Sequence, residues 1–204
     1  MVRIGVLVSG GGTNLQQLID AQAAGKLGGG EIVSVISSKP EVFALERARR
    51  AGIEAVTLSR KEYPDVETYS QALIAALKER QVELVVLSGF LTITSDSFVQ
   101  AFPNRVMNVH PALLPAFGGK GYYGLHVHEA VLQRGVKLTG ATVHFVNEVC
   151  DGGPIILQKA VEVKEGDTPE ALQRRVMEEA EWELLPRAIS LFCEGKLEVA
   201  QGKV

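Results

Sequence analysis

The chain has 204 residues and a formal net charge of −3, with 46% hydrophobic and 22% charged residues. This balance is typical of one globular domain with a real core, and it excludes a disordered chain or a strongly basic, nucleic-acid-binding one. Two cysteines are too few for a disulfide framework and fit a reducing cytosol, so we expect a cytoplasmic protein. No apolar run reaches the roughly 18 residues of a membrane span, and the start lacks a signal-peptide pattern.

The first half of the chain alternates predicted strands with predicted helices. Apolar and β-branched runs predict strands at residues 3–8, 31–37, 54–58 and 82–87. Amphipathic spacing predicts helices that begin after residue 14 and that cover 41–51 and 68–80. The run at 82–87 is apolar almost throughout, as in a parallel strand buried on both faces. This alternation predicts an α/β fold, a single-domain, doubly wound and mostly parallel sheet.

The second half departs from this alternation. A fifth strand is predicted at 105–109, followed by an irregular glycine-rich segment at 111–124 and a short helix at 126–134. Two alternating runs at 138–146 and 154–163 predict an antiparallel pair. Thr168 begins a long helix that extends towards Cys193, and we expect Pro186 to kink or divide it. The short tail is expected to add an edge strand.

A glycine-rich loop, Ser9 to Asn14, connects the first strand to the first helix. Free backbone N–H groups at a helix N-terminus favour an anion, so the loop predicts a phosphate site. It is not a P-loop, and Leu15 stands where the dinucleotide-binding pattern needs its third glycine. A plain strand-to-helix turn remains the alternative.

Asn108 and His110 lie two residues apart at the end of the fifth predicted strand, so their side chains share a face. Open α/β sheets build their sites at this edge. An asparagine amide can donate to a developing oxyanion, and a histidine can act as general acid or base. The alternative is a histidine with a purely structural role.

Asp151 lies in the glycine turn between the two antiparallel strands, where an acidic residue is usually only a turn former. It gains interest if the turn folds back over Asn108 and His110, because a carboxylate beside an imidazolium can orient water or take a proton. The four histidines have no cysteine at a useful spacing, so we expect no metal. We expect Cys150 to be a small buried residue and Trp182 to lie in the core.

Three blocks of sequence together resemble the folate-dependent formyltransferases, over about residues 2 to 197. They are Ser-Gly-Gly-Gly-Thr-Asn at 9–14, Asn-Val-His-Pro-Ala-Leu-Leu-Pro at 108–115, and Thr-Gly-Ala-Thr-Val-His-Phe-Val at 139–146 with Asp-Gly-Gly-Pro-Ile-Ile-Leu-Gln at 151–158. The form of the first block resembles the branch of this family that formylates glycinamide ribonucleotide in purine (IMP) synthesis.

The resemblance implies that 10-formyltetrahydrofolate is the co-substrate and that its formyl group passes directly to the glycinamide amine, through a tetrahedral intermediate and without a metal. It implies a catalytic trio of Asn108, His110 and Asp151. The ribose phosphate would be held by Gly12, Thr13 and Asn14, and the glycinamide end by Glu181. The folate pocket would be formed by two chain segments and Asn108, that is, by Leu91, Thr92, Ile93, Thr94, Asn108, Asn147, Glu148, Val149, Cys150 and Asp151.

The chain departs from the common pattern of the family in three places. Thr92 stands where many members carry an arginine, which removes a guanidinium from the folate tail. Trp182 follows Glu181 where many members have histidine, and the helix carries an extra residue nearby. The loop after Pro115 is longer than usual, and its segment 118–124 is expected to be a mobile flap over the folate.

Three other functions remain open at the level of sequence. A formyltetrahydrofolate hydrolase uses the same trio with water as acceptor but normally adds an N-terminal regulatory domain, and a methionyl-tRNA formyltransferase adds a C-terminal domain. A non-catalytic nucleotide-binding module would use only the glycine loop and would not need the trio to converge. We expect one formyltransferase domain, residues 1–204, that binds small molecules, contacts neither nucleic acid nor membrane, and is a monomer or homodimer.

Overall fold

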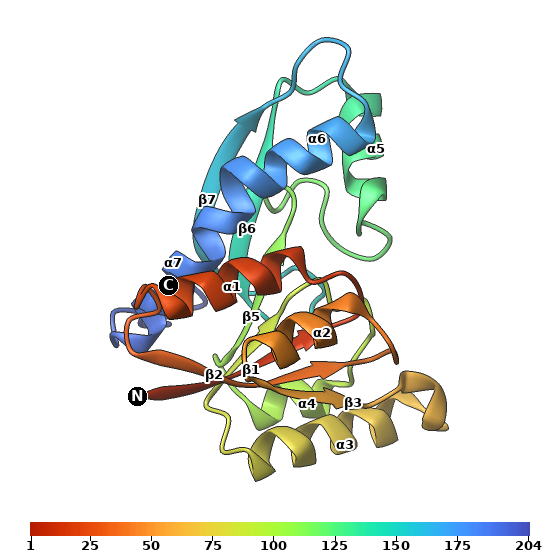
Figure 1. Ribbon diagram of the computed structural model, residues 1–204. Coiled ribbons are helices and arrows are strands. Elements are labelled where there is room, and N and C mark those ends of the chain that lie inside the picture. Colours follow the sequence, from red (N-terminus) through yellow and green to blue (C-terminus); the bar gives the residue numbers. More distant parts are fainter.

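The computed structural model describes residues 1–204 and contains one seven-stranded sheet in the order β3-β2-β1-β4-β5-β6-β7 (Figure 1). The strands are β1 (Val2–Val8), β2 (Gly30–Ser37), β3 (Glu54–Thr57), β4 (Leu84–Leu87), β5 (Val106–His110), β6 (Leu138–Phe145) and β7 (Ile155–Glu162). The first five strands pair in parallel, whereas β6 pairs antiparallel with both β5 and β7. The predicted α/β fold, with its parallel sheet and antiparallel end, is confirmed.

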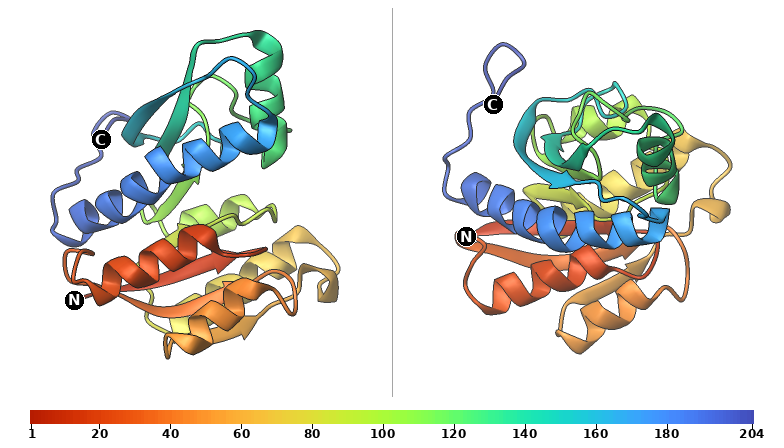
Figure 2. Two further views of the ribbon diagram at one scale, coloured as in Figure 1. Left: turned by 45° about the horizontal axis from the view of Figure 1, so that its top comes forward. Right: turned by 90° about the horizontal axis from the view of Figure 1, so that it is seen from above.

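Helices cover both faces of the sheet, as a doubly wound fold requires. They are α1 (Thr13–Ala23), α2 (Phe43–Arg50), α3 (Val66–Glu79), α4 (Asp96–Ala101), α5 (Leu125–Arg134), α6 (Pro169–Val176) and α7 (Trp182–Cys193), with a short 3₁₀ turn, η1 (Arg60–Glu62). Buried residues of α1, α2, α6 and α7 pack on one face, and those of α3 and α4 on the other (Figures 1 and 2). The side chains of β5 therefore alternate between two cores.

The C-terminal helix is continuous but irregular. Thr168 Oγ1 accepts from the Ala171 N–H, so the predicted cap is present. A π-helical turn, η2 (Met177–Glu181), separates α6 from α7. A π turn absorbs one extra residue while the flanking helices keep their buried faces, which agrees with the extra residue noted in the sequence. The prediction that Pro186 would divide the helix is wrong, because Pro186 lies inside α7 and the irregularity precedes it. A kink at Pro186 stays a prediction.

Two further elements differ from expectation. Helix α4 was not predicted, because it has six residues and buries only Phe98 and Val99, too few for a readable period. The tail adds no edge strand and forms only an isolated bridge between Ala200 and Lys203. None of the helices has the length and apolar character needed to span a membrane.

Candidate active site

Asn108 and His110 lie on β5 and share one face of the sheet, as the sequence predicts. His144 on β6 is the direct cross-strand partner of Asn108, so its side chain joins the same face. His110 and His144 are almost fully buried. The carboxyl end of β5 therefore presents one amide and two imidazoles within a few ångströms of each other.

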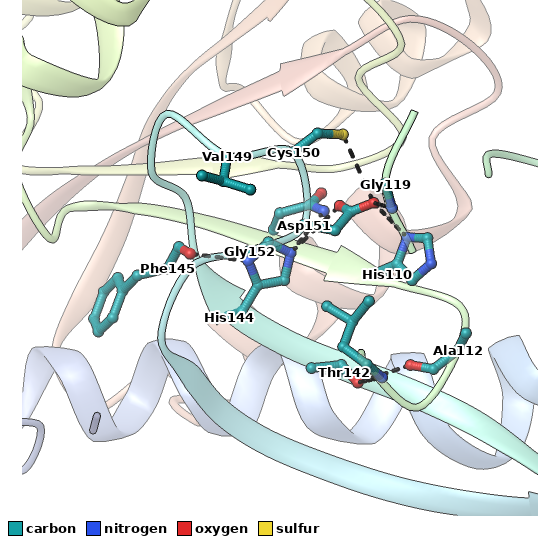
Figure 3. A network of polar contacts seen from close by, with 12 residues as sticks. His110, Ala112, Gly119, Thr142, His144, Phe145, Val149, Cys150, Asp151 and Gly152 are labelled. Atoms are coloured by element: carbon teal, nitrogen blue, oxygen red, sulfur yellow. Dashed lines mark hydrogen bonds and ion pairs between the residues drawn. The ribbon is translucent and has the colours of Figure 1, made fainter. Parts of the chain in front are cut away.

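The turn after β6 folds back over this face and carries Asp151 to it (Figure 3). Asp151 adopts a left-handed backbone with φ of 54°. A Cβ on Gly152 would come within 2.6 Å of Val149, and one on Gly153 would overlap the Phe145 carbonyl oxygen. Only glycine fits at both positions, so the Gly-Gly pair is what lets the turn close this tightly.

Asp151 lies between the two histidines. Its Oδ2 is 3.6 Å from His110 Nδ1, and its Oδ1 is 3.7 Å from His144 Nε2. The turn that carries Asp151 therefore folds back over Asn108 and His110, and the three predicted residues converge. His144 was missed as a site residue because only the register between β5 and β6 places it opposite Asn108.

The hydrogen bond of the His110 ring determines which of its two nitrogens carries the proton. Its Nε2 lies 2.7 Å from the Phe117 carbonyl oxygen, which can only accept, so this nitrogen carries a proton. The Nδ1 atom that faces Asp151 is then protonated only in the imidazolium form. A charged His110 would thus direct its Nδ1–H towards the space beside the Asp151 carboxylate. A reacting oxygen in that space could accept a hydrogen bond from this N–H.

His144 has the opposite arrangement. Its Nδ1 donates to the Phe145 carbonyl oxygen at 2.9 Å, which leaves Nε2 free to accept from Asn108 Nδ2 at 3.2 Å. Burial lowers the pKa of His144, so the ring is held neutral. The bond to His144 orients the Asn108 amide and leaves the second N–H on Nδ2 for a ligand.

The segment after Pro115 meets the site at two points. The Phe117 carbonyl accepts from His110, and the Gly119 N–H donates to Asp151 Oδ2 at 2.8 Å. Beyond these contacts the segment is exposed, with Tyr122 and Tyr123 both on the surface. The flap itself stays a prediction, but its first residues are contacts of the proposed catalytic groups.

The glycine-rich loop forms the N-terminus of α1. Gly12 is its N-cap in a left-handed conformation, with φ of 72°. The Gly12 carbonyl accepts from Gln16, whereas the N–H groups of Gly11, Gly12 and Thr13 donate to no protein atom. The loop therefore offers several unpaired donors together with the positive end of a helix dipole, as the sequence predicts.

Glu181 lies directly behind this loop. Its Oε2 accepts from Asn14 Nδ2 at 2.7 Å, and no cation pairs with it. The side chain is buried, and this burial raises its pKa to about 7. The acidic residues around it are exposed, so Glu181 is the one buried acidic side chain on that stretch of helix. A buried, singly bonded carboxyl group can take a hydroxyl or an amine from a bound substrate.

Two loops flank the trio where the folate pocket is expected. The Leu91 N–H donates to Ser9 Oγ at 3.0 Å, which ties the segment after β4 to the glycine-rich loop. In this segment Leu91 and Ile93 are exposed apolar side chains, and in the other Val149 is likewise exposed. Thr92, Thr94 and Asn147 are half-buried, and Glu148 is exposed. The exposed apolar groups offer a surface for a planar ring, but the pocket stays a prediction.

Several residues differ from their predicted surroundings. Cys150 is exposed rather than buried, since the turn directs it outward and its thiol lies 3.8 Å from Asp151 Oδ2. Trp182 is only partly buried and does not lie in the core, although its indole Nε1 is buried without a partner. His128 is fully buried with no partner for either ring nitrogen, and burial lowers its pKa to about 4.

Comparison with known proteins places the chain in a family. A model of the family described as formyl transferase matches residues 2–189. The chain belongs to the formyl transferase family. It is similar to a crystal structure of glycinamide ribonucleotide transformylase 1 from Symbiobacterium toebii, with 45% identity, a TM-score of 0.94, and coverage of 100% of this chain and 92% of that one.

Curated relatives agree with this family membership. The phosphoribosylglycinamide formyltransferase of Escherichia coli (strain K12) is 40% identical over 97% of this chain and 90% of its own length. The chloroplastic phosphoribosylglycinamide formyltransferase of Arabidopsis thaliana is also 40% identical, but the chain spans only 66% of it. The chain spans still less, 14% to 20%, of several trifunctional purine biosynthetic proteins that it matches.

Proposed function

We propose that this formyl transferase moves the formyl group of 10-formyltetrahydrofolate to the amine of glycinamide ribonucleotide, a step of de novo purine synthesis. The observation that carries the proposal is the position of Asp151, within 4 Å of both His110 and His144 and above the face that presents Asn108. A module that only binds nucleotides has no need of this convergence. The relatives named for this activity add support.

The chemistry follows from the donors and acceptors of the trio. The amine nitrogen attacks the formyl carbon, and the carbonyl oxygen becomes an oxyanion. Asn108 Nδ2 and the Nδ1 proton of a charged His110 stabilise this oxyanion. The carbon–nitrogen bond to the folate then breaks, and the amine proton reaches the departing folate nitrogen through Asp151 or a water molecule. Formyl-glycinamide ribonucleotide and tetrahydrofolate leave.

The remaining contacts would hold the two substrates in attack geometry, which accounts for much of the acceleration in such reactions. The ribose phosphate binds at Gly12, Thr13 and Asn14, and the buried carboxyl group of Glu181 receives a donor from the same substrate. The folate lies along residues 91–94 and 147–151. Thr92 leaves the folate tail without an arginine contact. Residues 1–204 act as one formyltransferase domain, as a monomer or homodimer, in the cytoplasm.

A turnover assay tests this proposal. The protein is supplied with 10-formyltetrahydrofolate, with and without glycinamide ribonucleotide, and release of tetrahydrofolate is followed. Release that depends on the amine supports formyl transfer. Release without the amine would replace the proposal with a hydrolase, and no release in either case would favour a binding module.

The variant Asp151→Asn tests the role of the trio. It keeps the size and shape of the side chain and can still accept from the Gly119 N–H, so the fold should be retained. It cannot take a proton or support a charged His110, so most of the turnover should be lost. Thermal unfolding of Asp151→Asn beside the native protein checks that the turn and the rest of the fold are kept. Near-normal turnover of Asp151→Asn would overturn the assigned role.

A further inference from the structure

Helix α2 contacts the glycine-rich loop through two hydrogen bonds. The Ala44 N–H in the first turn of α2 donates to the Gly10 carbonyl oxygen at 3.2 Å. Arg47, one turn further along, donates from Nε to the Gly11 carbonyl oxygen at 2.9 Å. Two successive loop carbonyls are therefore bound by the same helix.

These contacts orient the donors of the loop. In a trans peptide the C=O and the N–H point in opposite directions. Because the Gly10 and Gly11 carbonyls are directed to α2, the N–H groups of Gly11 and Gly12 point away from α2. A hydrogen bond to the carbonyl also polarises the peptide and strengthens its N–H as a donor.

Arg47 is held in this position by two further groups. Its Nη1 donates to Gln16 Oε1 at 2.9 Å, which connects it to α1. Its guanidinium carbon lies 4.7 Å from the centroid of the Phe43 ring. Arg50 packs against the same ring at 5.7 Å but bonds to Glu46 and makes no contact with the loop. Only one of these two arginines can act on the peptide of Gly11.

We propose that Arg47 is a positioning residue of the phosphate site, and that it acts through the Gly11–Gly12 peptide rather than by touching the phosphate. Its guanidinium lies on the carbonyl side of that peptide, opposite the N–H that faces the anion. The proposal rests on the proposed function for the identity of the substrate. The orientation of the loop amides is independent of it, because any phosphate would be bound by the same N–H groups.

The first experiment measures kinetics. Arg47→Met removes the donor and keeps a long side chain over Phe43, and Arg50→Met is the matched control. Loss of one oriented donor should raise KM for glycinamide ribonucleotide about tenfold. The kcat at saturation and KM for formyl-folate should stay within about twofold of the native values, as should every parameter of Arg50→Met. Arg47→Lys, which keeps one donor, should lie between native protein and Arg47→Met.

The second experiment needs no turnover. Inorganic phosphate is titrated into the native protein and the variants, and the amide resonances of Gly11, Gly12 and Thr13 are followed. Native protein and Arg50→Met should bind phosphate at these amides, and Arg47→Met should bind about tenfold more weakly. Equal phosphate affinity in native protein and Arg47→Met would overturn the proposal, as would an equal rise of both KM values. If the native protein shows no turnover, the proposed function fails, while this titration still decides the role of Arg47.

Discussion

Replacing Glu181 with glutamine should change how the stability of the protein depends on pH. The native carboxyl group is buried and bonded only to Asn14, and its pKa is raised from 4.5 to about 7. Glutamine has the same shape, and its amide oxygen can still accept from the Asn14 amide. The substitution therefore removes the ionisation while the packing and the hydrogen bond are kept.

The size of the effect follows from proton linkage. Between pH 4.5 and about 7 the folded state holds a proton on Glu181 that the unfolded state releases, so this group makes stability fall as pH rises. The two values differ by about 2.5 units, which corresponds to at most about 3 kcal/mol at 1.36 kcal/mol per unit. Glu181→Gln should thus exceed the native protein in stability at pH 8 by up to about 3 kcal/mol.

Urea unfolding at pH 5 and at pH 8 measures the difference in stability between Glu181→Gln and the native protein. The difference follows from the shift in the urea midpoint when the dependence of the unfolding free energy on urea is the same for both. The gain should be small at pH 5, where the folded native protein is already protonated at Glu181. Glu178→Gln is the matched control, because Glu178 lies in the same π turn and is exposed. It should show no comparable change at either pH.

Comparing variant with native protein at each pH removes the contributions of other titrating groups. His128 and His144, whose pKa values are lowered by burial, act in the opposite direction but are common to both proteins. A Glu181→Gln variant no more stable than the native protein at pH 8 would refute the reasoning. So would an equal gain at pH 5 and pH 8, since that would have a cause other than ionisation.

Three further predictions follow from the site and its surroundings. Asn108→Ala should lower kcat by about a hundredfold to a thousandfold, as loss of an oxyanion donor does, and near-normal kcat in steady-state assays would contradict that role. Gly12→Ala should destabilise the protein by about 1–3 kcal/mol in thermal unfolding because its φ is positive. Gly10→Ala is the control, because a Cβ at Gly10 would meet open space and should not destabilise the protein. Equal losses of stability in the two variants would contradict backbone strain at Gly12 as the cause. His128→Leu should lose less stability than the native protein between pH 7 and pH 5, because the native imidazole must gain a proton on unfolding. Urea unfolding at the two pH values measures both losses, and an equal loss of stability in the variant and the native protein would disprove this.

Much of the fold could be predicted from local patterns. Apolar runs of strand length and amphipathic runs of helix length are set by neighbouring residues, so the alternation of β1 to β4 with the helices α1 to α3 was readable. The shared face of Asn108 and His110 follows from the two-residue period of a strand, whatever surrounds it. The glycine-rich loop was readable for the same reason, since strand, glycines and helix follow one another directly.

Other parts of the candidate site depend on contacts between distant residues. Asn108 and His144 are neighbours only because of the register between β5 and β6. The carbonyl of Phe117 on His110 comes from an irregular segment that has no period to read. Helix α4 is too short for its pattern to stand out, and the π turn is a compromise between the two halves of one helix that both bury their apolar faces.

The sequence by itself determined the α/β class, the strand-end position of Asn108 and His110, and the glycine-rich loop, because each depends on spacing along one stretch of chain. Only the tertiary structure decided that Asp151 reaches His110, that Glu181 is buried against Asn14, and that Arg47 binds the Gly11 carbonyl. Each of those contacts joins residues 36 or more apart, so each depends on how whole elements pack. The chemical character of each side chain could be read from the sequence, whereas the meeting of these side chains in one site depends on the fold.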